Sequence, residues 1–251
     1  MSHLEPRDGV RLDVVDLAVT YGDRAAVGQV TFTVDPGEVV AVIGPNGAGK
    51  SSLLNAISGH ITHHGSVMLD GRHCHHRRDR ANLAIIPQRS DIDPNFPITV
   101  NELVASGRRR FLRVGRRPSG ADRAVVDNAL GVVGLADLSA RPIRTLSGGQ
   151  LQRAFLARAL AQEADIFLLD EALSGVDQPT VEELVGLFGE LGRSGASVLV
   201  ATHDLSLVRR RFDRCLPINR TLLADGPPNA ILDEHLLDRL FSAAELEPSV
   251  S

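Results

Sequence analysis

The segment Gly44–Ser51, with the sequence GPNGAGKS, constrains the fold more than any other feature of the chain. It follows a short apolar run, Val39–Ile43, and opens a segment of helical composition, Ser51–Ser58. Its glycines permit a tight turn in which backbone amides point inward at phosphate oxygens, and the helix N-terminus adds partial positive charge. A strand, a glycine-rich turn and a helix in this order predict a phosphate-binding loop.

The residue types in this loop suit a nucleotide with its metal ion. Lys50 places a compact cation on the β- and γ-phosphates, and the Ser51 hydroxyl suits Mg²⁺, a hard ion that prefers oxygen ligands. A chance glycine-rich turn is the alternative, which the flanking strand and helix disfavour. We therefore expect a nucleotide and Mg²⁺ at this loop. The expected contacts are Gly44, Pro45, Asn46, Gly47, Ala48, Gly49, Lys50, Ser51 and Ser52.

A second element with chemical potential is Ile166–Glu171, with the sequence IFLLDE. Two acids after an apolar strand are, taken alone, usually a solvated strand end. Beside a phosphate loop they fit a nucleotide site, because Asp170 can hold Mg²⁺ and Glu171 can act as general base on the attacking water.

Short apolar runs and the helical patterns between them predict an α/β architecture. The runs are near strand length and bounded by polar or glycine residues, which is typical of strands buried on both faces of a parallel sheet. Polar residues follow each run, at the edge where open α/β sheets bind ligands. The predicted strands are Val39–Ile43, Ile166–Leu169 and Val198–Ala201, and the later predicted helices are Gly148–Gln162 and Thr180–Leu191.

The remaining segments have other patterns. Val10–Val19 and Val27–Val34 have strand-like composition and are expected to pair as an antiparallel sheet. The stretch from Arg89 to Glu163 has more helical signals and is read as an inserted helical subdomain. The expected fold is a single α/β domain over residues 1–251. A P-loop NTPase core, a mixed sheet with flanking helices, comprises residues 10–88 and 164–241, and the helical subdomain comprises residues 89–163.

The net charge, the cysteine content and the hydrophobic pattern exclude several classes of function. The net charge of −4 gives no global basic field, so nucleic acid is not an expected partner. Cys74 and Cys215 form no CxxC pattern and suggest a reducing cytoplasm. The N-terminal segment lacks the apolar core of a signal peptide, and no apolar run approaches the roughly 20 residues that cross a bilayer. A role at a membrane would need spans from another chain.

The segment Leu146–Gln150, LSGGQ, followed by LQRAFLARAL, resembles the signature of the ATP-binding cassette (ABC) family. The order of elements is also similar: the phosphate loop, then Gln88, LSGGQ, LLDE and His203. The resemblance extends from about Leu12 to Phe241. It implies an ATPase that hydrolyses ATP to drive transport.

The family assigns roles to matching residues around the nucleotide. Tyr21 matches the aromatic residue that stacks on adenine, although a lone tyrosine near a strand end is otherwise usually packing. Gln88 matches the glutamine that senses the γ-phosphate and Mg²⁺. His203 matches the histidine that braces the γ-phosphate and the attacking water, with a buried core histidine as the alternative. The implied catalytic residues are Glu171, His203 and Gln88, and the implied metal ligands are Ser51, Gln88 and Asp170.

Other matches imply a second copy of the chain. Ser147, Gly148, Gly149 and Gln150 resemble the signature that closes over ATP bound to the other copy, and Asp177 matches a loop that contacts it. In the family the signature cannot reach its own phosphate loop, so a head-to-tail homodimer around two ATP molecules is expected.

The sequence departs from the family pattern at Ala172, where proline is usual after the catalytic glutamate. Because Asp170 and Glu171 are retained, activity is still expected.

Two segments resemble the ATPases of manganese, zinc and iron importers. They are Ile85–Arg108, which includes PQRS and FPITV, and Ile218–Leu232. This resemblance implies separate integral membrane permease subunits, an extracellular substrate-binding protein, and a location at the cytoplasmic face of the membrane. Another cargo, export, or a soluble regulatory switch without transport stay open as alternatives.

Two further clusters have open interpretations. Six of the nine histidines lie between His60 and His76 with Cys74 among them, which fits either a metal site or a solvated surface hairpin. The basic run Arg108–Arg117 could face anionic lipid headgroups or be a solvated face of the helical subdomain.

Overall fold

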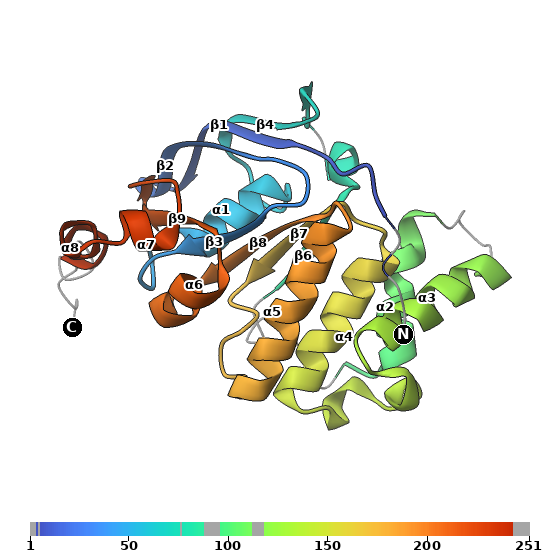
Figure 1. The fold of residues 1–251 in the computed structure, drawn as a ribbon. Coiled ribbons are helices and arrows are strands. Elements are labelled where there is room, and N and C mark those ends of the chain that lie inside the picture. Colours follow the sequence, from blue (N-terminus) through green and yellow to red (C-terminus); the bar gives the residue numbers. More distant parts are fainter. Residues whose placement is uncertain (1–3, 5, 76, 88–95, 112–117, 243–251) are drawn as a thin grey trace.

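The structure, a computed structural model, describes residues 4, 6–75, 77–87, 96–111 and 118–242 (Figure 1). Its described strands form two sheets, one of four strands in the order β2-β1-β4-β5 and one of six in the order β10-β9-β3-β8-β7-β6. Gln88 and the segment after it lie outside the described residues, and so does most of the basic run, residues 112–117.

The first sheet is antiparallel, as the sequence pattern predicts. Strand β1 (Leu12–Tyr21) pairs with β2 (Arg24–Val34) and with β4 (His64–Leu69), and β4 pairs with β5 (Arg72–His73). Alternate side chains near the start of β1 are buried, which leaves one face of the strand toward the core. Both predicted strand segments form, with ends shifted by a few residues.

The central sheet is parallel except at one edge. Strands β3 (Val39–Ile43), β6 (Leu83–Ile86), β7 (Ile166–Asp170), β8 (Ser197–Thr202) and β9 (Arg214–Asn219) run in the same direction. Strand β10 (Thr221–Leu222) pairs antiparallel with β9. Every residue of β7 and β8 is buried, as expected for strands covered on both faces. The predicted α/β fold with a mixed sheet is therefore confirmed.

Helices cover the central sheet and form a separate group at one end. α1 (Lys50–Ile57) lies between the two sheets, whereas α2 (Val100–Ala105), α3 (Gly120–Val132) and α4 (Gly148–Ala161) pack on one another (Figure 1). Further helices are α5 (Gln178–Arg193), α6 (Leu205–Arg211), α7 (Pro228–Ile231) and α8 (Glu234–Ser242). Short 3₁₀ turns occupy Arg77–Arg80, Ser106–Arg110, Ala136–Leu138 and Ile143–Thr145.

The three grouped helices begin at capping residues that the sequence supplies. Thr99, Ser119 and Ser147 each accept a hydrogen bond from the amide three residues on, and that third residue reaches back to the cap's amide. Such capping boxes satisfy backbone donors that a helix start would otherwise leave unpaired.

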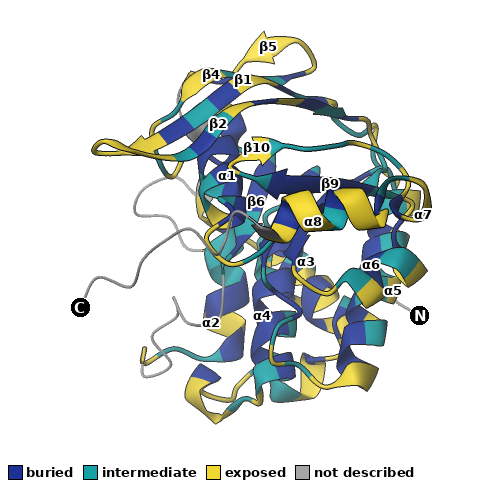
Figure 2. Cartoon of the chain, turned by 90° about the vertical axis from the view of Figure 1, so that its left-hand side faces the viewer, coloured by how far each residue is buried: buried dark blue, intermediate teal, exposed yellow. Residues whose placement is uncertain are grey.

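Two hydrophobic clusters hold the layers together. One lies between the two sheets and includes Leu53, Leu54 and Ile57 of α1, all fully buried. The other joins the opposite face of the central sheet to the grouped helices and α5. Figure 2 shows this buried interior running through α4 and β9, with exposed residues at the rim of the antiparallel sheet. Because α1 begins at the phosphate loop, its burial fixes that loop against both sheets.

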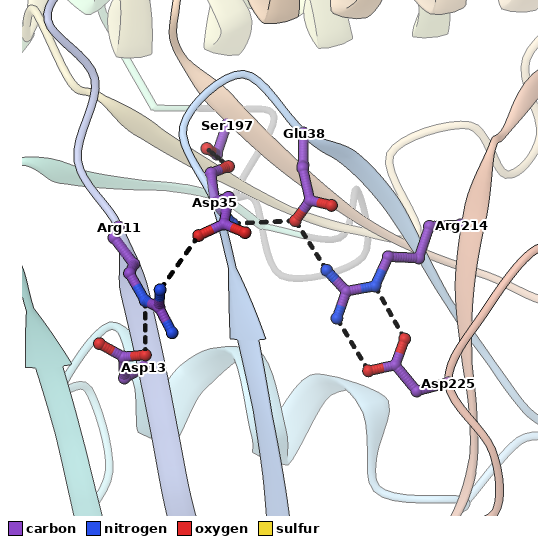
Figure 3. A network of polar contacts seen from close by, with 7 residues as sticks. All are labelled: Arg11, Asp13, Asp35, Glu38, Ser197, Arg214 and Asp225. Carbon is purple, nitrogen blue, oxygen red and sulfur yellow. Dashed lines mark hydrogen bonds and ion pairs between the residues drawn. The ribbon is translucent and has the colours of Figure 1, made fainter.

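A polar network links the loop before β3 to the starts of β8 and β9 (Figure 3). Arg214 pairs with both carboxylate oxygens of Asp225, at 2.7 and 2.8 Å, and with Glu38 at 2.7 Å. Glu38 also accepts from the Asp35 amide, and the Asp35 carbonyl accepts from the Ser197 hydroxyl. The two parallel hydrogen bonds from the Arg214 guanidinium to the Asp225 carboxylate add geometric specificity to the charge contact. The network therefore fixes the positions of the first residues of β3, β8 and β9 relative to one another.

Among the described residues, no helix has the length and apolar character that crossing a membrane requires.

The packing predicts a large penalty for opening a cavity at the centre of the sheet. Phe167 of β7 is fully buried, so Phe167→Ala should lower the free energy of unfolding by about 3–5 kcal/mol. Phe241 of α8 is 41% exposed, and Phe241→Ala should change it by no more than about 0.5 kcal/mol. Urea unfolding followed by circular dichroism measures both variants. Equal losses would show that Phe167 is not the core residue described.

Candidate nucleotide-binding site

The loop between β3 and α1 has the conformation that its glycines allow. Gly47 has φ 79° and Gly49 has φ 96°, in the left-handed region that side chains disfavour. A Cβ at Gly49 would lie 2.4 Å from the Ala26 carbonyl oxygen, and one at Gly44 would lie 2.3 Å from that of Ile218. Glycine is therefore required at Gly49 by both backbone angle and close packing, at Gly47 by backbone angle, and at Gly44 by close packing.

Lys50 begins α1 and is the only lysine in the chain. Its side chain is 5% exposed, and its ammonium donates to the carbonyl oxygens of Gly44 at 2.8 Å and Pro45 at 3.0 Å. The Glu171 carboxylate lies 3.7 Å away. Burial lowers the pKa of Lys50, and the negative charges of Glu171 and Asp170 act in the opposite direction. The loop thus folds around one buried cation.

Two oxygen ligands of the kind that Mg²⁺ prefers lie together beside this cation. The Ser51 hydroxyl donates to a carboxylate oxygen of Asp170 at 2.9 Å, and Asp170 is 3% exposed at the end of β7. They meet because β8 lies between β3 and β7, so that the loop after β3 and the end of β7 reach the same edge of the sheet. The donor set fits a small divalent cation.

A cavity of about 510 Å³ opens over the loop and brings distant segments together. Among its lining residues are Asn46, Lys50, Ser51 and Ser52 of the loop and α1, with Glu171 from the end of β7. Tyr21 lines it from the antiparallel sheet. This residue is 55% exposed, and its hydroxyl lies 3.5 Å from the Ser52 hydroxyl. The cavity therefore joins a phosphate-binding loop, two acids and an aromatic face.

Arg24 and Arg220 also line this cavity, and the sequence motifs did not identify them. Arg24 begins β2, close to Tyr21, whereas Arg220 lies between β9 and β10 with φ 61°. The Arg220 backbone joins the layers, because its amide donates to the Ala48 carbonyl and its carbonyl accepts from the Gly28 amide. No motif spacing connects these arginines to the loop, so only the fold shows that they line the site.

The signature residues lie apart from the cavity of their own chain. Ser147 caps α4, accepting from the Gln150 amide at 3.3 Å, while the Gln150 side chain accepts from the Ser147 amide at 2.9 Å. None of Ser147, Gly148, Gly149 and Gln150 lines the cavity over the phosphate loop. Ser147 is exposed, and Gly149 packs against Thr180 at the start of α5.

Asp177 and His203 also lie outside this cavity. Asp177 caps α5, accepting from the amide and the hydroxyl of Thr180, and these hydrogen bonds lower the pKa of Asp177. His203 follows β8 and is exposed, so it is not a buried core histidine. Gln88, the third predicted catalytic residue, lies outside the described residues.

Two members of the histidine cluster contact polar side chains of their own chain. His63 lies 2.8 Å from the guanidinium of Arg80, which is 6% exposed, and His60 lies 2.8 Å from the Ser58 hydroxyl. In the part of the chain that the structure describes, no group of three or more His, Cys, Asp or Glu residues could hold a metal ion. In the basic run, Arg108 is 8% exposed and pairs with Asp122 and Glu163, so it stabilises the helical group rather than facing outward.

The parallel sheet, the glycine-rich loop and the acids at the end of β7 define a P-loop ATPase. Comparison with known proteins gives the family: the model of the ABC transporter family matches residues 27–174, more than half of the chain. The chain therefore belongs to the ABC transporter family and is the ATP-binding, ATP-hydrolysing subunit of such a transporter.

Proteins of metal transport systems and a solved ABC transporter component match most of this chain. The chain is 40% identical to the manganese transport system ATP-binding protein MntA of Synechocystis, over 92% of this chain and 90% of that protein. It is 38% identical to the chelated iron transport system membrane protein YfeB of Yersinia pestis, over 92% and 78%. The structure of cbiO1 from Clostridium perfringens, part of the ABC transporter complex cbiONQ, is 28% identical with a TM-score of 0.77, covering 92% of this chain and 94% of that one.

The burial of the Lys50 ammonium in the phosphate loop predicts that replacing Lys50 weakens nucleotide binding. Lys50→Ala should weaken nucleotide binding by about tenfold or more, because a charge-assisted contact to phosphate is lost. Tyr21 is the only tyrosine and the chain has no tryptophan, so intrinsic fluorescence reports from this cavity during an ATP titration. Arg211→Ala, which removes a half-exposed cation of α6, serves as the control and should bind normally. Unchanged affinity in Lys50→Ala would contradict the phosphate-loop assignment.

Proposed function

We propose that this chain is the ATPase of an importer for a divalent transition metal, of the manganese, zinc or iron class. Two copies close head to tail around two ATP molecules and act on separate permease subunits from the cytoplasmic face of the membrane. The observation that carries the nucleotide chemistry is the meeting of Lys50, Ser51, Asp170 and Glu171 at one edge of the central sheet.

The site residues divide into those that hold ATP and those that act on water. Backbone amides of residues 44–52 and the Lys50 ammonium receive the phosphates, and the Tyr21 ring receives adenine. Ser51, Asp170 and Gln88 hold Mg²⁺, which neutralises charge on the phosphates when bound. These assignments rest on the oxygen pair at 2.9 Å and on the aromatic ring at the mouth of the cavity.

Glu171 acts as general base in this proposal. Its carboxylate takes a proton from water while the water oxygen bonds to the γ-phosphorus, and the bond to the bridging oxygen breaks to release ADP. His203 and Gln88 orient the water and the γ-phosphate. The position of Glu171 directly after Asp170 places base and metal ligand side by side at the end of β7.

The position of the signature supports a second copy in the active assembly. The N-terminus of the 14-residue helix α4 is capped by an exposed Ser147, away from the chain's own cavity. A helix N-terminus favours a phosphate, so Ser147–Gln150 can complete the site of a partner copy. Asp177, at the start of α5, lies on the contacting loop. We accordingly divide the domain into a nucleotide-binding core, residues 10–88 and 164–241, and a signature subdomain, residues 89–163.

The cargo is inferred from the relatives and from the segments Ile85–Arg108 and Ile218–Leu232. Relatives named for manganese and chelated iron transport match this chain over most of its length. A permease supplies the membrane path, and an extracellular substrate-binding protein delivers the metal. A soluble regulatory switch is the alternative function, and copurification of a membrane partner separates it from a transporter subunit.

The experiment that tests this function is elemental analysis of cells grown on limiting metals. Cells carrying Lys50→Ala or Glu171→Gln should lose one of manganese, zinc or iron selectively, because transport stops when ATP binding or hydrolysis stops. Arg211→Ala should leave metal content normal. Unchanged metal content in both site variants would remove the metal-importer proposal while leaving the ATPase in place.

A further inference from the structure

Glu171 has an unusual backbone conformation for a residue with a long side chain. Its φ is 46°, in the left-handed region that residues other than glycine, asparagine and aspartate seldom occupy. It lies directly after β7, where Asp170 still has extended strand geometry. Such outliers persist where surrounding contacts hold them, and they cluster at functional sites.

One contact that accompanies this conformation is an ion pair with Lys50. The Lys50 ammonium has three donors, and three protein oxygens surround it: those of Gly44 and Pro45 at 2.8 and 3.0 Å, and a Glu171 carboxylate oxygen at 3.7 Å. The Glu171 side chain is 14% exposed, so this pair is partly shielded from water. The cation of the phosphate loop is thus already surrounded by oxygen atoms of its own chain.

Ala172 is the residue that permits this arrangement. Glu171 and Ser174 close a turn through a 3.0 Å hydrogen bond, with Ala172 at its second position. Proline suits that position of a turn, but it disfavours α-type backbone in the residue before it and shifts that residue toward extended backbone. Among the described residues the Ala172 amide donates no hydrogen bond, so proline at 172 would break none of the hydrogen bonds between them. The conformation of Glu171 is what proline at 172 would change.

We propose that Ala172 is a positioning residue: it lets Glu171 take the left-handed conformation in which the carboxylate rests on Lys50 and competes with nucleotide phosphate for that cation. We call the Lys50–Glu171 contact the resting pair. This inference rests on the proposed roles of Lys50 and Glu171. Phosphate entry displaces the carboxylate, so the event that binds nucleotide also frees the base to meet water.

The test uses four variants of the full chain: Ala172→Pro, the control Ala172→Gly, Glu171→Gln, and Glu171→Gln combined with Ala172→Pro. MgADP is the probe, because it has no γ-phosphate to hydrolyse. Tyr21 fluorescence gives its affinity. Lysine labelling gives one side-chain NMR resonance, since Lys50 is the only lysine, and its position at fixed pH reports the neighbouring carboxylate.

Ala172→Pro should shift the Lys50 resonance and tighten MgADP binding about fivefold, the scale of one partly shielded ion pair. Glu171→Gln should do the same, adding Ala172→Pro to it should do nothing more, and Ala172→Gly should match the unaltered chain. The proposal would be overturned if Ala172→Pro left both the Lys50 resonance and the MgADP affinity unchanged. It would also be overturned if Ala172→Pro had the same effect in the Glu171→Gln chain as in the unaltered chain.

Two further measurements keep the outcome decisive. If Ala172→Pro does not fold, the unaltered chain should still show a strong amide-to-Hα contact within Glu171, typical of positive φ, that weakens when MgADP is added. Its absence would overturn the proposal. A chain that binds no MgADP at all would instead contradict the nucleotide site, while the Lys50 resonance still tests the resting pair.

Discussion

The buried ammonium of Lys50 is the constraint on which the site depends. A charge removed from water is costly unless oxygen atoms surround it, and this one has two loop carbonyls and a carboxylate. The glycines allow the loop to fold around that cation. The burial of α1 between the two sheets holds the loop in place. In the arrangement that we propose, an entering phosphate displaces the Glu171 carboxylate from this cation.

The order of strands in the central sheet brings the other site residues next to the Lys50 loop. With β8 between β3 and β7, the phosphate loop and the two acids share one edge, and β9 brings Arg220 to the same place. The antiparallel sheet then contributes Tyr21 from the opposite side of α1. The network around Arg214 fixes the other ends of β3, β8 and β9, so the edge that binds nucleotide is held by contacts well away from it.

The sequence predicted the parts of the fold whose signals are local. The phosphate loop, strands β3, β7 and β8, and helices α4 and α5 have apolar runs, glycines or caps that identify them within a short window. The roles of Arg24 and Arg220 could not be predicted, because they depend on contacts between segments far apart in the chain. The contact between Glu171 and Lys50 could not be predicted either, because the two residues lie far apart in the chain and no local pattern shows the left-handed backbone of Glu171.

The separation of the signature from its own cavity makes a two-chain site the central claim, and mixing two inactive variants tests it most directly. Lys50→Ala lacks a working phosphate loop, and Ser147→Arg lacks a working signature. If copies pair head to tail, a mixed dimer has one site with both parts intact. ATP turnover should therefore appear on mixing, although neither variant hydrolyses ATP alone. A mixture as inactive as its components would contradict the claim that ATP is hydrolysed between two chains.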